Sequence, residues 1–258
     1  MAKTPTRNSR PRRPRSNTSP SDLVPVKATL RAYRVGFGDC FLLTFEYASG
    51  DSRHVLIDFG TTRLPIRSAA DEQKKTTQVA KFHLEVAERI AAVCGPKLHV
   101  VVATHRHKDH ISGFATGSPG KRLSGDIIRG LKPDLVILPW TEDPQAAVDA
   151  TGPTKTMSKA PNALHAAGLS AMQSFAGQIL ASAEQEIAQI KRRNNGQRVP
   201  RDLERLRFLG EDNLSNKSAV ENLLTMGSQR LYAAYGTPID LSQVLPGVQV
   251  RVLGPPTL

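Results

Sequence analysis

The order of hydrophobic patterns along the chain predicts an α/β (α+β) domain. Residues 79–93 place apolar side chains at helical spacing, at Val79, Phe82, Val86, Ile90 and Val93. The nearly continuous apolar run His99–Ala103 follows, and a second such run covers Asp134–Trp140. Apolar runs of this length are typical of strands that are buried on both faces. A helix followed by two buried strands indicates layers of helix and sheet.

Strands are also predicted before this helix. Residues 27–35 alternate between apolar and polar side chains, as one face of a sheet requires. Residues 40–47 and 53–59 predict two more strands, separated by turns at 36–39 and 48–51. Gly95-Pro96 predicts the end of the helix.

The second half of the chain is predicted to be more helical. Apolar residues from Leu164 to Ile190 follow a helical face, and the basic tract Lys191–Arg207 comes next. Ser218 and Glu221 have the spacing of a capping box, which predicts a helix that ends near Met226. Residues 231–235 and 248–253 are predicted as strands.

Composition limits the class of protein. The chain has 258 residues, of which 39% are hydrophobic and 22% charged, which excludes a fully disordered or collagen-like chain. Two cysteines, Cys40 and Cys94, are too few for a disulfide framework and fit a reducing compartment. No apolar run reaches the ~18 residues of a membrane span, and the basic N-terminus lacks the apolar core of a signal peptide. We therefore expect a cytoplasmic protein without a membrane partner.

The net charge of +12 is uneven along the chain. Residues 1–22 combine six basic side chains and four prolines with a single acid, Asp22, and predict a disordered basic arm. The arm either binds a polyanion such as nucleic acid or serves as a solubilising tail. The arginines that would contact nucleic acid are Arg10, Arg12, Arg13 and Arg15. The folded domain is predicted to cover residues 23–258.

A cluster of potential metal ligands follows the buried strand. His105, His107, Asp109 and His110 fall within six residues, in Thr104-His-Arg-His-Lys-Asp-His110. In an extended segment, side chains two residues apart share a side, so His105 and His107 are expected to hold one ion. Asp109 and His110 are expected to face a second ion. Imidazole and carboxylate suit Zn²⁺ best, with Mn²⁺ or Fe²⁺ as alternatives.

This motif resembles the signature of the metallo-β-lactamase superfamily. The resemblance implies a four-layer αββα sandwich with the metal site at the edge between two sheets. Leu56-Ile-Asp-Phe-Gly60 resembles a further family motif, and it implies that Asp58 orients the histidine loop, which begins at Thr104, without binding metal. Gly36-Phe-Gly-Asp-Cys40 and Val252-Leu-Gly-Pro-Pro256 resemble the competence-type branch, whose members are nuclease-like domains of DNA-uptake proteins.

The resemblance also predicts the reaction. His107 stands where the oxygen-reducing branch of the superfamily has Glu, which favours hydrolysis. A metal-bound hydroxide would attack a phosphodiester or other anionic substrate, and Asp109 would orient the water or accept its proton. The later ligands of the family do not follow Pro256, so we expect a domain incomplete at its C-terminal half.

Two alternatives remain open beside the hydrolase. An incomplete domain would act as a metal-binding or interaction protein, completed by a partner or a second chain, and it would expose an apolar sheet surface. A polyanion binder would work through the basic arm. Other residues with metal-binding side chains are expected to be structural: His54, His83, His99, His165, Asp126, Cys40 and Cys94.

Overall fold

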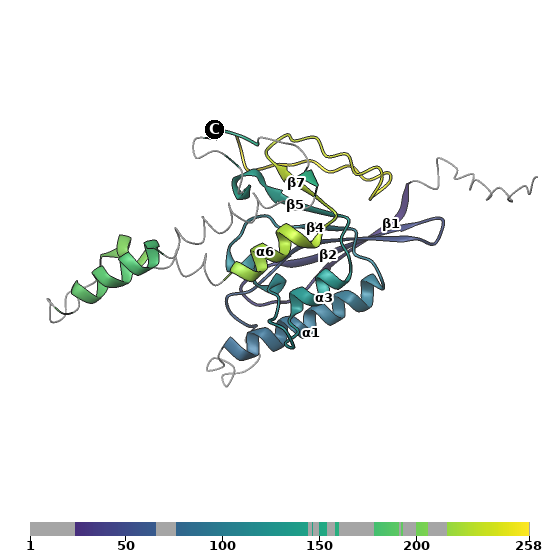
Figure 1. The fold of residues 1–258 in the computed structure, drawn as a ribbon. Coiled ribbons are helices and arrows are strands. Elements are labelled where there is room, and N and C mark those ends of the chain that lie inside the picture. The colour runs from purple at the N-terminus through teal and green to yellow at the C-terminus, as the bar shows by residue number, and fades with distance from the viewer. Residues whose placement is uncertain are drawn as a thin grey trace, which may run out of the picture.

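The structure is a computed structural model of the chain. It describes residues 24–65, 76–143, 146, 150–153, 158–159, 178–190, 192, 200–205 and 216–257. These residues form a mixed α/β fold around one seven-stranded sheet of order β1-β2-β3-β4-β5-β7-β6 (Figure 1). The basic arm with Arg10, Arg12, Arg13 and Arg15 lies outside the described residues, as does His165. Residues 178–190 are helical, as the apolar spacing predicts.

The first three strands form an antiparallel meander. They are β1 (Pro25–Ala32), β2 (Cys40–Tyr47) and β3 (Ser52–Phe59), and all three are predicted by the sequence. β1 ends before the predicted Val35. Beyond it, Gly36 has a positive φ of 97°, and the Phe37 amide donates to the Arg63 carbonyl instead of to β2.

The other half of the sheet is mainly parallel. β4 (Val100–Val102) pairs with β3, β5 (Leu135–Pro139) pairs with β4, and β7 (Gln229–Ala233) pairs with β5. The two-residue strand β6 (Ser158–Lys159) pairs antiparallel with β7. Because β3, β4 and β5 run in the same direction, the loops that follow them emerge at one edge of the sheet.

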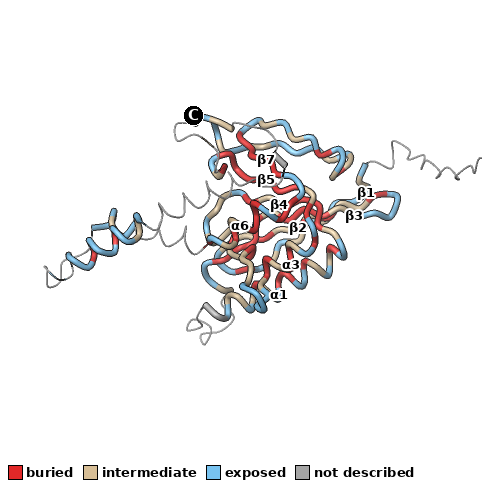
Figure 2. Tube along the Cα trace, viewed as in Figure 1, coloured by how far each residue is buried: buried red, intermediate tan, exposed pale blue. Residues whose placement is uncertain are grey.

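Helices cover one face of the sheet. α1 (Thr76–Cys94), α3 (Ser124–Gly130) and α6 (Lys217–Met226) lie on that face in Figure 1. Their apolar sides share one buried core with the sheet, shown in red in Figure 2, which includes Leu42, Leu56 and Val101. The predicted cap at Ser218 is wrong. α6 begins one residue earlier, after Asn216, whose side-chain amide donates to the Arg106 carbonyl (3.3 Å).

The segment after β7 covers part of the opposite face. Leu241 and Leu245 are buried there against side chains of β3, β4, β5 and β7. The predicted strand at 248–253 is wrong, because an isolated bridge between Pro238 and Arg251 is its only recorded strand pairing among the described residues. None of the helices in the described part of the chain is both long and apolar enough to cross a membrane.

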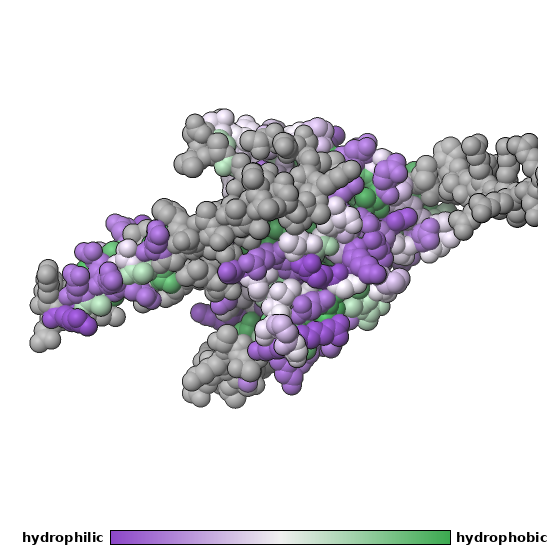
Figure 3. All heavy atoms as spheres, viewed as in Figure 1, coloured by the Kyte–Doolittle hydropathy of each residue, from purple (hydrophilic) through white to green (hydrophobic). Residues whose placement is uncertain are grey.

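The β1 edge of that opposite face is left open. Val26 and Leu30 have relative exposures of 67% and 62%. Hydrophobic residues appear in green near this edge in Figure 3, whereas hydrophilic residues cover most of the visible surface. Among the described residues, helices therefore cover one face of the sheet, and the segment after β7 covers only part of the other.

Candidate metal centre

The histidine motif forms the turn that follows β4. The Ala103 amide still donates to the Ile137 carbonyl, after which the chain leaves the sheet. His107 precedes the one-turn helix α2 (Lys108–Ile111), and its carbonyl accepts the amides of His110 and Ile111. His105 therefore lies on an extended segment, whereas Asp109 and His110 lie on a helical turn. The change of backbone conformation bends the motif around a common point.

Two glycines allow another part of the chain to pack directly against this turn. A β-carbon at Gly60 would lie 2.6 Å from the Lys108 carbonyl oxygen, and one at Gly38 would lie 2.5 Å from the Asp109 carbonyl oxygen. The Asp39 amide donates to the same Asp109 carbonyl (3.0 Å). The Gly-rich turn before β2 and the end of β3 thus form a backbone cradle for the motif.

Three of the four predicted ligands form a compact group. Potential ligand atoms of His105, Asp109 and His110 all lie within 4.8 Å of one another. His107 is exposed and not part of that group, although its ring centroid lies 4.7 Å from that of His105. His105 therefore groups with Asp109 and His110, and it also lies beside His107, the residue with which the sequence predicts it to share an ion.

Asp58 supports this group from the end of β3. It is 3% exposed, and its backbone has a positive φ of 51°. One carboxylate oxygen accepts the Thr104 amide (2.7 Å), and the other accepts the Thr104 hydroxyl (2.6 Å) and Nδ1 of His110 (2.8 Å). Both oxygens are engaged by the motif, which is the orienting role expected for this residue.

The hydrogen bonds leave one nitrogen of each histidine available. His110 donates Nδ1–H to Asp58, and its Nε2 lies 3.6 Å from Oδ2 of Asp109. The Thr104 hydroxyl donates to Asp58 and therefore accepts Nδ1–H of His105 (3.1 Å). These contacts engage Nδ1 of both imidazoles and leave Nε2 of each as the nitrogen that could bind a metal ion.

The surroundings of His105 favour its neutral form. Burial lowers the pKa of His105, and the neighbouring His110 and His107 lower it further, whereas Asp58 and Asp109 raise it. The ring centroids of His105 and His110 are 3.7 Å apart, so two protonated rings would repel each other strongly. Neutral imidazole is the ligand form, so this arrangement favours metal over protons.

A second carboxylate, that of Asp39, lies near the same nitrogen of His110. Oxygen atoms of Asp39 and Asp58 lie with His110 in a group of metal-ligand size, and Oδ2 of Asp39 is 3.5 Å from Nδ1 of His110. Because Asp58 already accepts three hydrogen bonds, this group is a hydrogen-bonded support and not a second ion site.

The remaining histidines that the structure describes are remote from the motif or buried beside it. His54 and His99 lie at the opposite end of β3 and β4, where Nδ1 of His99 accepts the His54 amide (3.1 Å). Burial lowers the pKa of His99 to about 4. His83 on α1 is 3% exposed, and its ring packs edge-on against Phe59 (5.3 Å between centroids). Among the described residues, these side chains have the structural roles expected from the sequence.

Two other predictions concern possible ligands elsewhere. Cys40 and Cys94 are free thiols buried in the core, and burial raises the pKa of both, for Cys94 to about 12. Asp126 lies in the first turn of α3 and accepts the amides of Leu123 (2.8 Å) and Gly117 (2.9 Å). The Asp126 carboxylate therefore satisfies backbone amides at the start of α3. Asp126 is the third residue of the helix, and Leu123 is the N-cap residue.

One charged pair at this edge was missed by sequence reasoning. Glu142 follows β5 in the short helix η4 (Trp140–Glu142), and its Oε2 lies 3.2 Å from Nε of Arg106. Burial raises the pKa of Glu142, while Arg106 and His107 lower it. The available signal was its position after a buried strand, which brings it to the same sheet edge as the motif.

Comparison of the chain with family models, with curated proteins and with solved structures finds no match. Support for a function therefore comes from the arrangement of the site's own side chains.

Proposed function

We propose that this protein is a metal-dependent hydrolase of the metallo-β-lactamase type. The observation that carries the proposal is the group of His105, Asp109 and His110, whose donor atoms lie within 4.8 Å of one another. Asp58 and Thr104 engage Nδ1 of both histidines, which leaves Nε2 of each as the potential ligand atom. A polar surface turn has no need for two oriented imidazoles and a carboxylate at this spacing.

The donor set fits Zn²⁺ best. Two imidazole nitrogens and one carboxylate oxygen are ligands that zinc accepts, and a site with three protein ligands keeps one position open for water or substrate. Mn²⁺ and Fe²⁺ accept the same donors. His107 is exposed and lies beside His105. Its imidazole is a fourth potential ligand, so the proposed site holds one or two ions.

A bound divalent ion would lower the pKa of water toward ~7 and polarise the oxygen of the group to be hydrolysed. The Asp109 carboxylate lies within 4.8 Å of potential ligand nitrogens of both histidines, where it is placed to orient the attacking water or to accept its proton. His105 is kept neutral by burial and by its imidazole neighbours. The formal charge of +12 favours the approach of anions, so a phosphodiester or similar anionic substrate is the proposed class.

The cradle around the motif supports the competence-type branch of the superfamily. The resemblance in residues 36–40 rests on glycines, and Gly38 lies where a β-carbon would collide with the Asp109 carbonyl. Helices on one face of the sheet, with residues 239–252 on the other, are compatible with an αββα sandwich. A cytoplasmic location also remains part of the proposal, on the evidence of the two free thiols.

Metal content measured on purified protein tests the proposal. After saturation with Zn²⁺ and removal of excess, the wild type should retain one to two ions per chain, and His105→Ala and His110→Ala should retain fewer. His165→Ala, which alters a histidine outside the motif, is the control. Zinc-loaded wild type should then hydrolyse bis(p-nitrophenyl) phosphate. A wild type that retains no metal would exclude the hydrolase, and a metal-loaded protein without this activity would exclude the phosphodiester class.

The open β1 edge favours one alternative, an interaction protein completed by a partner or a second chain. Val26 and Leu30 on this edge are more than half exposed. Exposed apolar sheet surface of this kind favours association. Sizing in solution discriminates the two functions: a monomer with a cooperative melt and bound zinc favours the hydrolase, whereas an oligomer without bound metal favours the interaction protein.

A further inference from the structure

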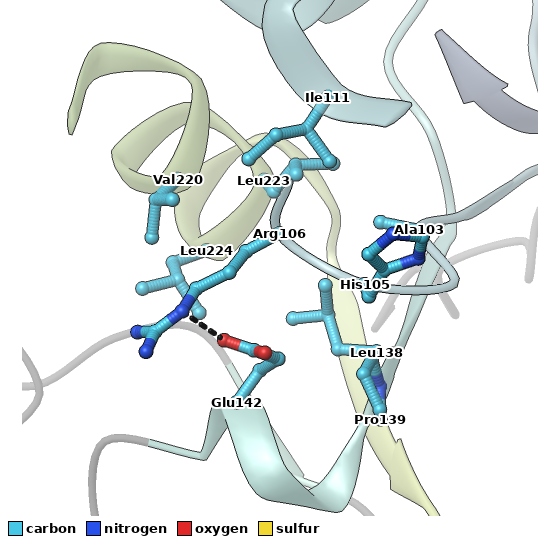
Figure 4. Close-up of a pocket in the computed structure, with 10 residues that line it drawn as sticks. All are labelled: Ala103, His105, Arg106, Ile111, Leu138, Pro139, Glu142, Val220, Leu223 and Leu224. Atoms are coloured by element: carbon cyan, nitrogen blue, oxygen red, sulfur yellow. Dashed lines mark ion pairs between the residues drawn. The ribbon is translucent and has the colours of Figure 1, made fainter. Parts of the chain in front are cut away.

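An apolar pocket opens directly beside the histidine motif. Its volume is about 410 Å³, including the open solvent at its mouth. Figure 4 shows three sides: the turn that carries His105 and Arg106, the end of β5, and helix α6. The apolar lining comes from Ala103, Ile111, Leu138, Val220, Leu223 and Leu224.

The only charged residues in this lining are Arg106 and Glu142, and they form an ion pair with each other (3.2 Å). Figure 4 shows the pair spanning the space between the motif turn and η4. The side chain of Glu142 is 18% exposed, so its carboxylate depends on Arg106 for a counter-charge. Since the two charges cancel, the pocket has no net charge to offer a charged ligand.

The contrast between the pocket and the motif defines what each can bind. His105 borders both, so the pocket lies next to the group of potential ligands. The motif offers polar donors and a carboxylate, whereas the pocket offers aliphatic walls from α6 and β5. Because that volume includes open solvent, the space enclosed by side chains is much smaller, and it accommodates only a short alkyl group and not a long chain or a ring system.

We propose that this pocket is a subsite for a compact apolar group of the substrate, attached next to the bond that is cleaved at the motif. This inference rests on the proposed function for the position of the cleaved bond. The substrate class is an ester-like or phosphoester compound with a short alkyl substituent of a few carbons. Val220 is the specificity-determining residue at the partly exposed side of the pocket.

Binding of a homologous series tests the subsite without requiring turnover. The probes are acetate, propionate, butyrate and pentanoate, titrated into metal-free and zinc-loaded protein and followed by methyl NMR of Leu138, Leu223 and Val220. Burial of each added methylene should raise the affinity about threefold to fourfold until the pocket is full. The methyl resonances should shift more with the longer acids in both forms of the protein.

Two variants on α6 make the test specific. Val220→Trp fills the pocket from its partly exposed side and should abolish the gain per methylene. Ser218→Trp adds the same indole to the same helix outside the pocket lining and should retain it. Well-dispersed methyl spectra and a wild-type melting temperature check that both variants are folded.

The outcomes separate this inference from the proposed function. A dependence of affinity on chain length that Val220→Trp abolishes supports the subsite. If the same protein retains no zinc, the subsite is still supported and only the proposed hydrolase function is excluded. Equal affinities for all four acids, in a protein that does bind zinc, would overturn the subsite and leave the metal centre intact. A dependence that persists in Val220→Trp would also overturn it.

Discussion

Asp58 and His110 are 52 residues apart in the chain, yet Oδ2 of Asp58 lies 2.8 Å from Nδ1 of His110. Parallel pairing of β3 with β4 brings them together, because it places the end of β3 next to the turn that follows β4. The contact decides which nitrogen of His110 faces Asp109. A buried carboxylate at the end of one strand thus orients a histidine in the helical turn that follows the next strand.

Asp58→Asn should weaken metal binding without unfolding the protein. An amide oxygen can still accept one bond, but the amide nitrogen cannot accept from Thr104 or His110, so the histidines lose their fixed tautomers. Loss of such a supporting hydrogen bond reduces metal affinity about 10- to 100-fold. A chelator competition titration measures this. Asp39→Asn, at 3.5 Å from the same nitrogen, is the matched control and should have a smaller effect. Equal affinities for wild type and Asp58→Asn would contradict the orienting role.

Gly60→Ala should destabilise the fold and disturb the site. Its β-carbon would lie 2.6 Å from the Lys108 carbonyl oxygen and 2.7 Å from backbone carbons of Asp109 and His110. The backbone of α2 must move to relieve such contacts, at a cost of roughly 1–3 kcal/mol in the free energy of unfolding. Urea unfolding measures the change. Gly130→Ala, which meets no atom within 4 Å, should be neutral or stabilising. A Gly60→Ala variant as stable as wild type would show that the backbone around Gly60 can accept a β-carbon, which would contradict the close packing of α2 against the end of β3.

His83 should make the protein sensitive to acid. It is 3% exposed, its Nε2 has no hydrogen-bond partner among the described residues, and burial, with Lys108 nearby, lowers its pKa to about 4. The unfolded chain takes up a proton at this histidine near pH 6.5, whereas the folded chain does so only near pH 4. The stability present above pH 6.5 is therefore lost as the pH falls from 6.5 to 4, by roughly 3 kcal/mol for this group.

His83→Phe tests this assignment. The variant keeps a ring beside Phe59 and removes the titrating group, so its stability should fall less than that of wild type between pH 7 and pH 4.5. Urea unfolding at both values gives the difference. Part of the dependence should remain, since the pKa of His99 is also lowered to about 4. Parallel losses in wild type and variant would assign the acid sensitivity to other groups.

Deletion of residues 1–22 should weaken binding to duplex DNA. The segment contributes six basic side chains, and each phosphate contact adds about 0.9 to the slope of log affinity against log salt concentration. The slope should decrease by roughly 3 to 5 in the deletion, as measured by fluorescence anisotropy. A full-length variant with Arg10, Arg12, Arg13 and Arg15 changed to Gln should reproduce most of this loss. An unchanged slope would identify the segment as a solubilising tail.

Much of the sheet follows from local pattern alone. Residues 40–47 and 53–59 form strands at or within one residue of their predicted bounds, because alternation and a buried apolar run are properties of neighbouring residues. Residues 248–253 show the limit of that reasoning. Val248 and Val252 pack against the sheet, yet the segment is not a strand, because a strand also needs a neighbour with which to exchange backbone hydrogen bonds.

The sequence by itself determined the layering of helix and sheet and the six-residue cluster of ligand types, since both depend on residues close together in the chain. The tertiary structure alone decided which ligands meet. The bend at His107 groups His105 with Asp109 and His110, and Asp58 contacts His110 directly from a different strand and His105 through Thr104. The pairing of Arg106 with Glu142 and the pocket beside it have the same origin. Parallel strands bring distant loops to one edge of the sheet, and no local pattern records which side chains will then face each other.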